Sequence, residues 1–230
     1  MNALDAELQL KAAVLPDDLC SKMNESGVSL NYVLSPSFVE PEDYHWFVLR
    51  VPYGKEREVA ETIQSPTLFS YAPVQTIARI RNGKRQLVEV SALPNMFFAY
   101  AREADLQYYE QRQIVLKNHP KWQPGQLRFM YDHTQKNELG YDRKMTVPME
   151  QMRNFIRVTM QHDEHVRIYL NDAFSAKQGD WVEVVEGKFA GVRGRVARLH
   201  GQTCVLVGLE GICVASTAYV PKAFLKKINL

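Results

Sequence analysis

The stretch 162–165 reads His-Asp-Glu-His and places two imidazoles three residues apart. On a helix, that spacing allows two histidines to bind one metal ion. No further His or Cys is a near neighbour in the sequence, so the pattern supplies only part of a typical zinc site. We therefore expect a solvated polar segment and no metal. A metal-dependent enzyme that uses His162 and His165 is kept as a third alternative.

Other patterns that support catalysis are also weak. Cys204 and Cys213 fall in expected strands outside any activating motif, so we interpret both as buried thiols. The sequence contains neither a Gly-x-Ser-x-Gly elbow nor a phosphate-binding loop. Glu56 and Glu58 lie on a helix that we expect to be exposed, without an apolar pocket to raise a carboxyl pKa. The sequence predicts no enzymatic activity and no cofactor.

Basic side chains gather at Arg79, Arg81, Lys84 and Arg85, on either side of an Asn-Gly pair. Because Arg and Lys neutralise phosphates, contact with nucleic acid is one interpretation. The tips of hairpins are also charged in many proteins that bind no nucleic acid. The four residues are therefore candidate nucleic-acid contacts, and a solvated tip is the alternative.

The overall composition is that of a globular protein, with 230 residues, 46% hydrophobic and 23% charged. The formal net charge of +2 is unevenly spread, because residues 1–45 hold two basic and eight acidic side chains. Residues 1–43 are predicted to be an acidic extension that masks the basic domain, binds a further partner, or does neither. No apolar stretch approaches the roughly 18 residues of a membrane helix, so we expect a cytoplasmic protein.

Residues 44–160 alternate between strand and helix patterns and predict an α+β domain. An Asn-Gly pair at 82–83 between two alternating segments indicates a β-hairpin. Pro148 precedes methionines that recur every three or four residues, which indicates a helix. The expected strands are 45–52, 94–101 and 126–132, and the expected helices are 54–64, 103–112 and 147–160. One antiparallel or mixed sheet with helices packed on it, an α/β sandwich, accommodates them.

The end of the chain has a different composition. Seven of the twelve glycines lie in the last 55 residues, between short β-branched runs. That pattern is typical of a small, tightly curved β-barrel, which we place at 177–230. The intervening residues 161–176 are predicted to be a linker, in which 166–170 can add one strand.

The segment "VEVVEGKFAGVRGRV" (182–196) alternates like a strand, stops at glycines and alternates again. Glycines permit the bulge or positive φ that a sharp bend requires, so Gly187, Gly191 and Gly194 would supply the bend and Phe189 would fill it. This spacing resembles the KOW motif. KOW modules occur in ribosomal proteins, in chromatin elongation factors and in the NusG family of transcription factors.

The preceding domain favours the last of these families. Residues 46–63, "WFVLRVPYGKEREVAETI", resemble the first strand and helix of the NusG amino-terminal (NGN) domain, and "RNGKR" resembles its basic hairpin. "LPNMFFAY" (93–100) resembles a later strand, with Asn95 in place of glycine as in the specialised paralog RfaH. "PMEQMRNFIRV" and "TAYVPKAFLKKI" are similar to the UpxY-type antiterminators. The resemblance covers about 46–230.

The resemblance implies a bacterial transcription elongation or antitermination factor. Its first domain would bind the clamp helices of the largest RNA polymerase subunit and suppress pausing or termination, in specific long operons such as those of polysaccharide biosynthesis. Carried over residue by residue, the polymerase contact falls on Leu93, Pro94, Met96 and Phe98, with Trp46 anchoring the first strand. Met96 stands where the family usually has tyrosine.

The carboxy-terminal module would contact the termination factor Rho or a ribosomal small-subunit protein. An apolar strand edge in 205–212 is its expected contact surface, although Val205, Leu206 and Val207 themselves are interpreted as barrel core. The alternative function is that of a KOW-type RNA-binding or ribosome-associated module. Residues 93–100 carry large apolar side chains at both alternating positions, so the strand is either covered on both faces or leaves one face for a partner.

Overall fold

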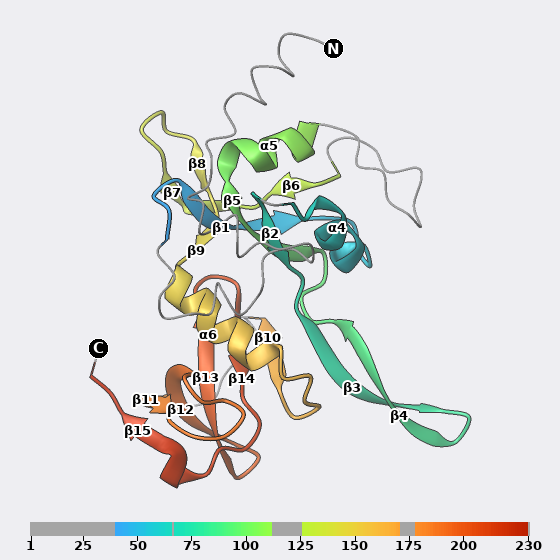
Figure 1. The fold of residues 1–230 in the computed structure, drawn as a ribbon, viewed down its shortest axis with the longest axis vertical. Coiled ribbons are helices and arrows are strands. Elements are labelled where there is room, and N and C mark those ends of the chain that lie inside the picture. Colours follow the sequence, from blue (N-terminus) through green and yellow to red (C-terminus); the bar gives the residue numbers. More distant parts are fainter. Residues whose placement is uncertain (1–39, 66, 112–125, 171–177, 230) are drawn as a thin grey trace.

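The computed structural model describes residues 40–65, 67–111, 126–170 and 178–229. The first sheet with its helices, a further helix and a second sheet succeed one another along the molecule (Figure 1). The described part of the chain therefore contains both helices and sheets, as the sequence predicts for an α+β protein. No helix in this part is both long and apolar enough to cross a membrane. The predictions for 1–39 lie outside the described residues.

The first sheet is built around strand β1 (Tyr44–Arg50). β1 pairs antiparallel with β5 (Met96–Arg102), β6 (Arg128–Phe129) and β9 (Thr146–Val147). β2 (Phe69–Tyr71) pairs antiparallel with the other edge of β5, which gives the order β2–β5–β1–β6. The sheet is antiparallel, one of the two arrangements that the sequence left open.

Both faces of this sheet are covered. Helices α4 (Glu56–Ile63) and α5 (Glu103–Gln111) lie on one face, where Phe47 and Leu49 of β1 join their apolar cluster. The other face carries Trp46 and Val48 and packs against helix α6 (Met149–Thr159). Successive side chains of a strand point to opposite faces, so a strand covered on both is apolar throughout. The first of the two alternatives for the apolar strand is confirmed over most of β5.

A long hairpin projects from the sheet (Figure 1). Its strands β3 (Val74–Arg81) and β4 (Lys84–Ser91) pair over their full length. The turn residues Asn82 and Gly83 have φ of 50° and 72°, as a two-residue turn with positive φ at both central positions requires. The predicted hairpin and its turn are confirmed.

The predicted strand 126–132 is divided in two. β6 ends at Phe129, and β7 (Tyr131–Lys136) turns away to pair with β8 (Asp142–Lys144). Met130 lies between them, and its backbone N–H donates to the Val48 carbonyl at 2.9 Å. The chain thus keeps contact with β1 at the point where it changes direction.

The second sheet contains six strands in the order β10–β14–β13–β12–β11–β15. Their bounds are β10 (Arg167–Leu170), β11 (Gln178–Val184), β12 (Arg193–Leu199), β13 (Gln202–Leu209), β14 (Cys213–Ser216) and β15 (Leu225–Lys227), the last preceded by the short helix η2 (Lys222–Phe224). Within the described residues β10 and β15 are edges that do not pair with each other, so the predicted closed barrel is not confirmed.

β10 is the strand that the sequence allowed at 166–170 within the predicted linker 161–176, and it pairs with β14. One detail of the second sheet differs from expectation. β13 is hydrogen-bonded to β12 on one side and β14 on the other, so it offers no free strand edge. The predicted contact edge in 205–212 is therefore wrong, because the apolar residues of this segment are buried inside the sheet.

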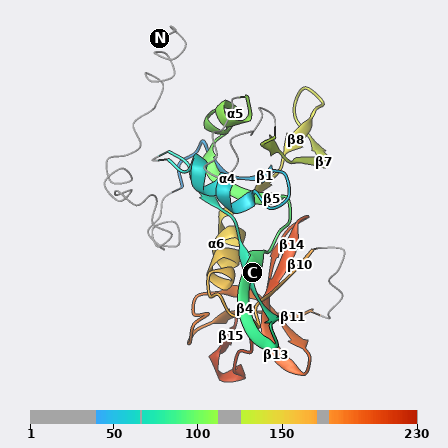
Figure 2. The same ribbon diagram turned by 90° about the vertical axis from the view of Figure 1, so that its right-hand side faces the viewer.

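Helix α6 lies between the two sheets in both ribbon views (Figures 1 and 2). One apolar cluster contains Phe98 of the first sheet, Phe155 of α6 and Val205 of the second sheet. Polar contacts reinforce this packing. Asn154 accepts a hydrogen bond from the Arg193 backbone N–H at 2.8 Å, and Arg157 donates to the Gly191 carbonyl at 3.2 Å. The two parts of the chain share a continuous core through α6.

Candidate functional site

The five residues predicted to contact a polymerase lie at very different depths. Trp46, Leu93 and Phe98 are 0% exposed. Pro94 is exposed and Met96 is partly buried. Only the last two present surface to a partner in this conformation.

Helix α6 contacts Trp46 and Phe98, and Leu93 belongs to the same apolar cluster. The ring of Phe155 meets Phe98 edge to face at 5.8 Å between centroids. The indole N–H of Trp46 donates to the Met149 sulfur at 3.4 Å. Sequence reasoning placed these residues on the correct strands, but it could not determine which face a distant helix would cover.

Methionines surround the part of this sheet face where β1 ends. Met96, Met130 and Met145 are partly buried and pack on the same apolar cluster as Val48. Val48 donates to the Met145 carbonyl at 3.1 Å and accepts from Met130 at 2.9 Å, so both methionines flank this residue. We call Met96, Met130 and Met145 the methionine patch. Methionine is flexible and polarizable and is favoured at surfaces that adapt to a partner.

Little in the sequence indicated the methionine patch. Its members come from three segments that only the sheet brings together: the start of β5, the break after β6 and the loop before β9. The one available signal was the total of eight methionines in the chain. Arg50 and Pro94 are exposed beside the patch, and Arg50 lies opposite Met96 in the pairing of β1 with β5.

A buried carboxylate positions the turn that leads into this surface. Glu56 is 2% exposed, and one carboxylate oxygen accepts from the backbone N–H of Asn95 at 2.7 Å and of Gly54 at 3.2 Å. Asn95 has φ of 67°, a conformation that asparagine tolerates better than most residues. The expectation that Glu56 is exposed is wrong, because its partner lies 39 residues away in sequence.

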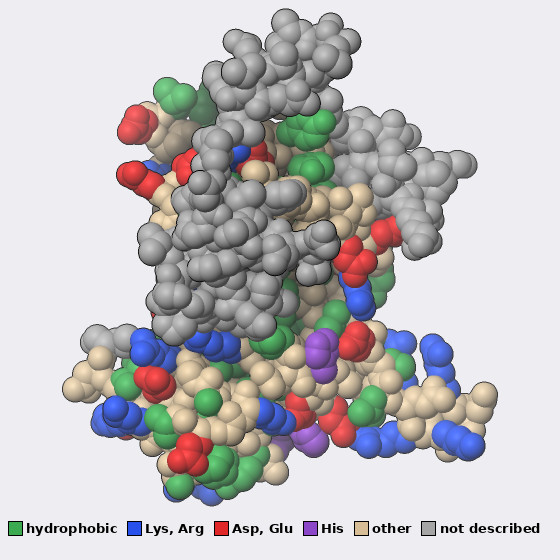
Figure 3. All heavy atoms as spheres, viewed as in Figure 1, with side chains coloured by type: hydrophobic (Ala, Val, Ile, Leu, Met, Phe, Trp, Pro, Cys, Tyr) green, Lys and Arg blue, Asp and Glu red, His purple; other side chains and the backbone are tan. Residues whose placement is uncertain are grey.

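The four basic residues of the hairpin divide between its two faces. Residues directly opposite each other share a face, and Arg81 is opposite Lys84 while Arg79 is opposite Gln86. Arg85 is opposite Ile80 and lies on the other face, where it forms an ion pair with Glu164. Three cations, Arg79, Arg81 and Lys84, therefore form one exposed basic face. Lys and Arg side chains gather at the projecting hairpin in Figure 3.

The two histidines of 162–165 have different partners. His162 Nδ1 lies 2.8 Å from a carboxylate oxygen of Glu89, whereas His165 Nδ1 lies 3.1 Å from Asp163. Within the described residues, no group of three or more His, Cys, Asp or Glu side chains is arranged to hold a metal ion. The segment instead links three parts of the molecule, because Asp163 also pairs with Lys188 of the second sheet region.

The glycine-rich loop between β11 and β12 packs inward. Phe189 is 3% exposed and joins the shared apolar cluster, while Gly187 and Gly191 have φ of 83° and 82°. The role of Gly194 differs from the one predicted from the sequence, which was to supply the bend. It has no positive φ, but a Cβ there would lie 2.1 Å from the Leu206 carbonyl oxygen. Close approach of β12 to β13, and not backbone conformation, requires glycine at 194.

The buried thiols behave as predicted. Cys204 and Cys213 are both buried in the second sheet. Burial raises the pKa of Cys204 to about 11 and the pKa of Cys213 to about 12. Both side chains are therefore neutral near pH 7, which does not favour a nucleophilic role.

Comparison with known families matches residues 44–156 to NusG, described as transcription termination factor nusG. The matched segment begins with β1 and ends within α6, so it contains the first sheet, the hairpin and the methionine patch. No curated protein matches the chain.

Proposed function

We propose, from the match of residues 44–156 to the NusG family, that the protein is a transcription elongation or antitermination factor that binds RNA polymerase. The family match is the observation that carries the proposal. It extends over all the elements that position the methionine patch and the basic hairpin. The proposed action is binding and not catalysis, and its place is the bacterial cytoplasm, where polymerase works.

We propose that the methionine patch, with Pro94, forms the polymerase contact. This surface is the accessible part of the sheet face on which the sequence predicted the contact. Met96 and Pro94 are predicted contact residues that are also accessible. Trp46, Leu93 and Phe98 would support this surface from below. The clamp helices of the largest polymerase subunit are the proposed partner, because a helix pair can lay apolar side chains into such a surface.

A specialised role in antitermination of long operons, such as those for polysaccharides, is the finer form of the proposal. Its support is the similarity of 148–158 and 217–228 to UpxY-type sequences and Asn95 in the turn before β5. The basic face of the hairpin would lie against nucleic acid in the elongation complex. Rho or a ribosomal protein would then bind the second sheet on surfaces that α6 leaves free.

Direct binding to core RNA polymerase tests the proposal. The double variant Met96→Ala/Met130→Ala should weaken binding by about tenfold or more if the patch is an energetic centre of the interface. Met160→Ala is the matched control, because Met160 is also a partly buried methionine on the shared cluster but lies past the far end of α6. Equal affinities of the double variant, the control and the unmodified chain would rule out the patch as the contact.

The alternative, a KOW-type RNA-binding or ribosome-associated module, is favoured by the exposed Arg193, Arg195 and Arg198 of β12. All three arginines already have partners, since Arg193 pairs with Glu183, Arg195 lies over the Trp181 ring and Arg198 donates to the Gly201 carbonyl. Salt separates the two functions. RNA binding through arginine should fall steeply with ionic strength, whereas an apolar polymerase contact should change little.

A further inference from the structure

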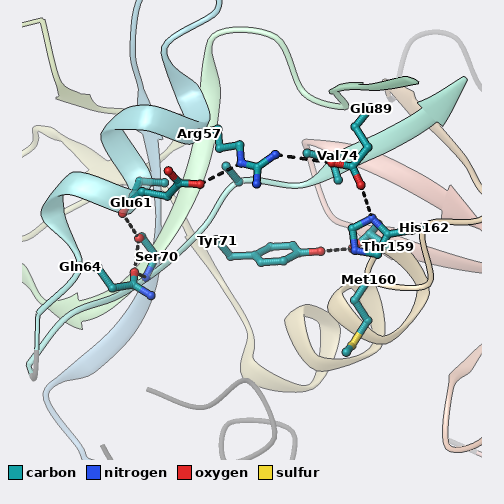
Figure 4. A pocket seen from close by; sticks show the side chains of 12 residues that line it. Arg57, Glu61, Gln64, Ser70, Tyr71, Val74, Glu89, Thr159, Met160 and His162 are labelled. Atoms are coloured by element: carbon teal, nitrogen blue, oxygen red, sulfur yellow. Dashed lines mark hydrogen bonds and ion pairs between the residues drawn. The ribbon is translucent and has the colours of Figure 1, made fainter. Parts of the chain in front are cut away.

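A cavity of about 300 Å³ opens where α4, β2, the base of the hairpin and the end of α6 meet (Figure 4). This volume is at the lower end of the range for small-ligand pockets. Neither the methionine patch nor the basic face of the hairpin contributes to its lining. The proposed polymerase contact therefore leaves the cavity without a role.

The inner walls of the cavity are largely apolar and electrically neutral. Ala60, Ala72, Val74 and Met160 line them together with Tyr71. The Tyr71 hydroxyl lies 2.6 Å from the Thr159 hydroxyl, and burial raises the pKa of Tyr71 to about 12. The phenol is therefore neutral at physiological pH. These walls suit a short aliphatic chain.

The mouth of the cavity has an excess of negative charge. Arg57 Nε lies 2.8 Å from Glu61 Oε1. Arg57 Nη1 lies 3.5 Å from Glu89 Oε2, which is longer than a good hydrogen bond. The other oxygen of Glu89 is engaged by His162 at 2.8 Å. Besides His162, one guanidinium, that of Arg57, faces the two carboxylates of Glu61 and Glu89, and Figure 4 shows Glu89 between Arg57 and His162.

We propose that this cavity binds a cationic group carried on a short apolar stem, namely an alkylguanidinium or alkylammonium. The stem lies against Tyr71, Val74 and Met160, and the cation meets the weakly engaged oxygen of Glu89 with Glu61 close by. Charge complementarity favours a cation over a neutral or anionic ligand. The inference does not depend on polymerase binding.

Titration of the full-length, ¹⁵N-labelled chain with agmatine tests the proposal. Agmatine carries a guanidinium and an ammonium on a four-carbon stem. Saturable shifts are expected in the backbone amide signals of Ser70, Tyr71, Ala72 and Thr159, at concentrations on the order of millimolar for so small a ligand. Pentanoate, which has a similar stem and the opposite charge, should produce no such shifts. Absence of saturation with agmatine, or equal shifts with pentanoate, would overturn the proposal.

Charge-neutral variants locate the site. Glu89→Gln should weaken agmatine binding by about three- to fivefold, the scale of one partly exposed ion pair. Glu186→Gln removes the same charge from an exposed position that does not line the cavity, and it should leave the affinity unchanged. Equal weakening by both variants would show that only net charge matters and would overturn the assignment.

A second probe, N-acetyl-arginine amide, distinguishes a protein side chain from a free amine as the source of the cation, because it imitates an arginine within a polypeptide. Binding as tight as that of agmatine would identify a protein side chain as a ligand that the cavity accepts. Binding of agmatine alone would identify a free amine. Failure of both probes, with polymerase binding intact, would refute this inference and leave the proposed function standing.

Discussion

Replacement of Phe98 by alanine distinguishes a core residue from a contact residue. Phe98 is 0% exposed, and its ring meets Phe155 of α6 edge to face at 5.8 Å. Truncation of a buried phenylalanine costs about 3–5 kcal/mol, because the apolar transfer energy is lost and a cavity is left. For a chain of this size, each kcal/mol lowers Tm by roughly 2–4 °C, so Phe98→Ala should lower Tm by about 6–20 °C.

Differential scanning calorimetry measures the effect, and Met96→Ala serves as the comparison. Met96 is partly buried on the same strand and the same face, two residues away. Its truncation should cost about 1–2 kcal/mol, since less apolar area leaves the protein interior. The effects on polymerase affinity should have the opposite order. Among folded molecules, Met96→Ala should weaken binding more than Phe98→Ala.

One result would refute this reasoning. If Phe98→Ala kept the Tm of the unmodified chain while abolishing polymerase binding, Phe98 would be a contact residue and α6 would not cover it in solution.

Three further predictions concern residues outside the patch. Gly194→Ala should destabilise the protein by about 1–3 kcal/mol or more in urea unfolding, because its Cβ would lie 2.1 Å from the Leu206 carbonyl oxygen. Gly208→Ala, where a Cβ meets nothing within 4 Å, should change stability by less than about 0.5 kcal/mol, and similar losses for both would contradict this account. Glu56→Ala should cost about 1.5–3 kcal/mol, because two backbone N–H groups lose a charged acceptor, and Glu56→Gln should cost less; an unchanged urea midpoint for Glu56→Ala would exclude this role. The pKa of Tyr71 is raised to about 12 in the folded protein from an ordinary value of 10. Its contribution to the free energy of unfolding is therefore complete below pH 10 and is lost as the pH rises toward 12. Tyr71→Phe should make the decline in stability shallower over that window, and an identical pH profile would count against burial as the cause.

The local elements of the fold could be predicted because their signals are local. Asn82 and Gly83 specify their own turn, and Pro148 immediately precedes α6. Short, nearly continuous apolar runs identified β1 and β5 without knowledge of their neighbours. In each case the residues that carry the signal are those that form the element.

The rest of the site depends on contacts between distant segments. The burial of Glu56 is set by Asn95, and that of Trp46 by Met149, 103 residues away. The sequence shows that Phe98 is apolar. It does not show whether the side chain is buried beneath α6 or exposed to a partner, because both situations require an apolar residue. The sequence allowed a strand at 166–170, but it could not show that this strand, β10, pairs with β14.

The position of α6 limits how a polymerase can bind. Met152, Phe155, Ile156 and Val158 of this helix are each 0% exposed. Leaving a buried side chain of this kind in water costs about 1.5–3 kcal/mol, so uncovering all four would cost roughly 6–12 kcal/mol. A micromolar to nanomolar complex has a binding free energy of only about −8 to −12 kcal/mol. A partner that displaced α6 to reach Trp46 and Phe98 would have to bury the helix again elsewhere, whereas a partner that bound the methionine patch would not. The structure therefore favours recognition at the end of β1, with the helix in place.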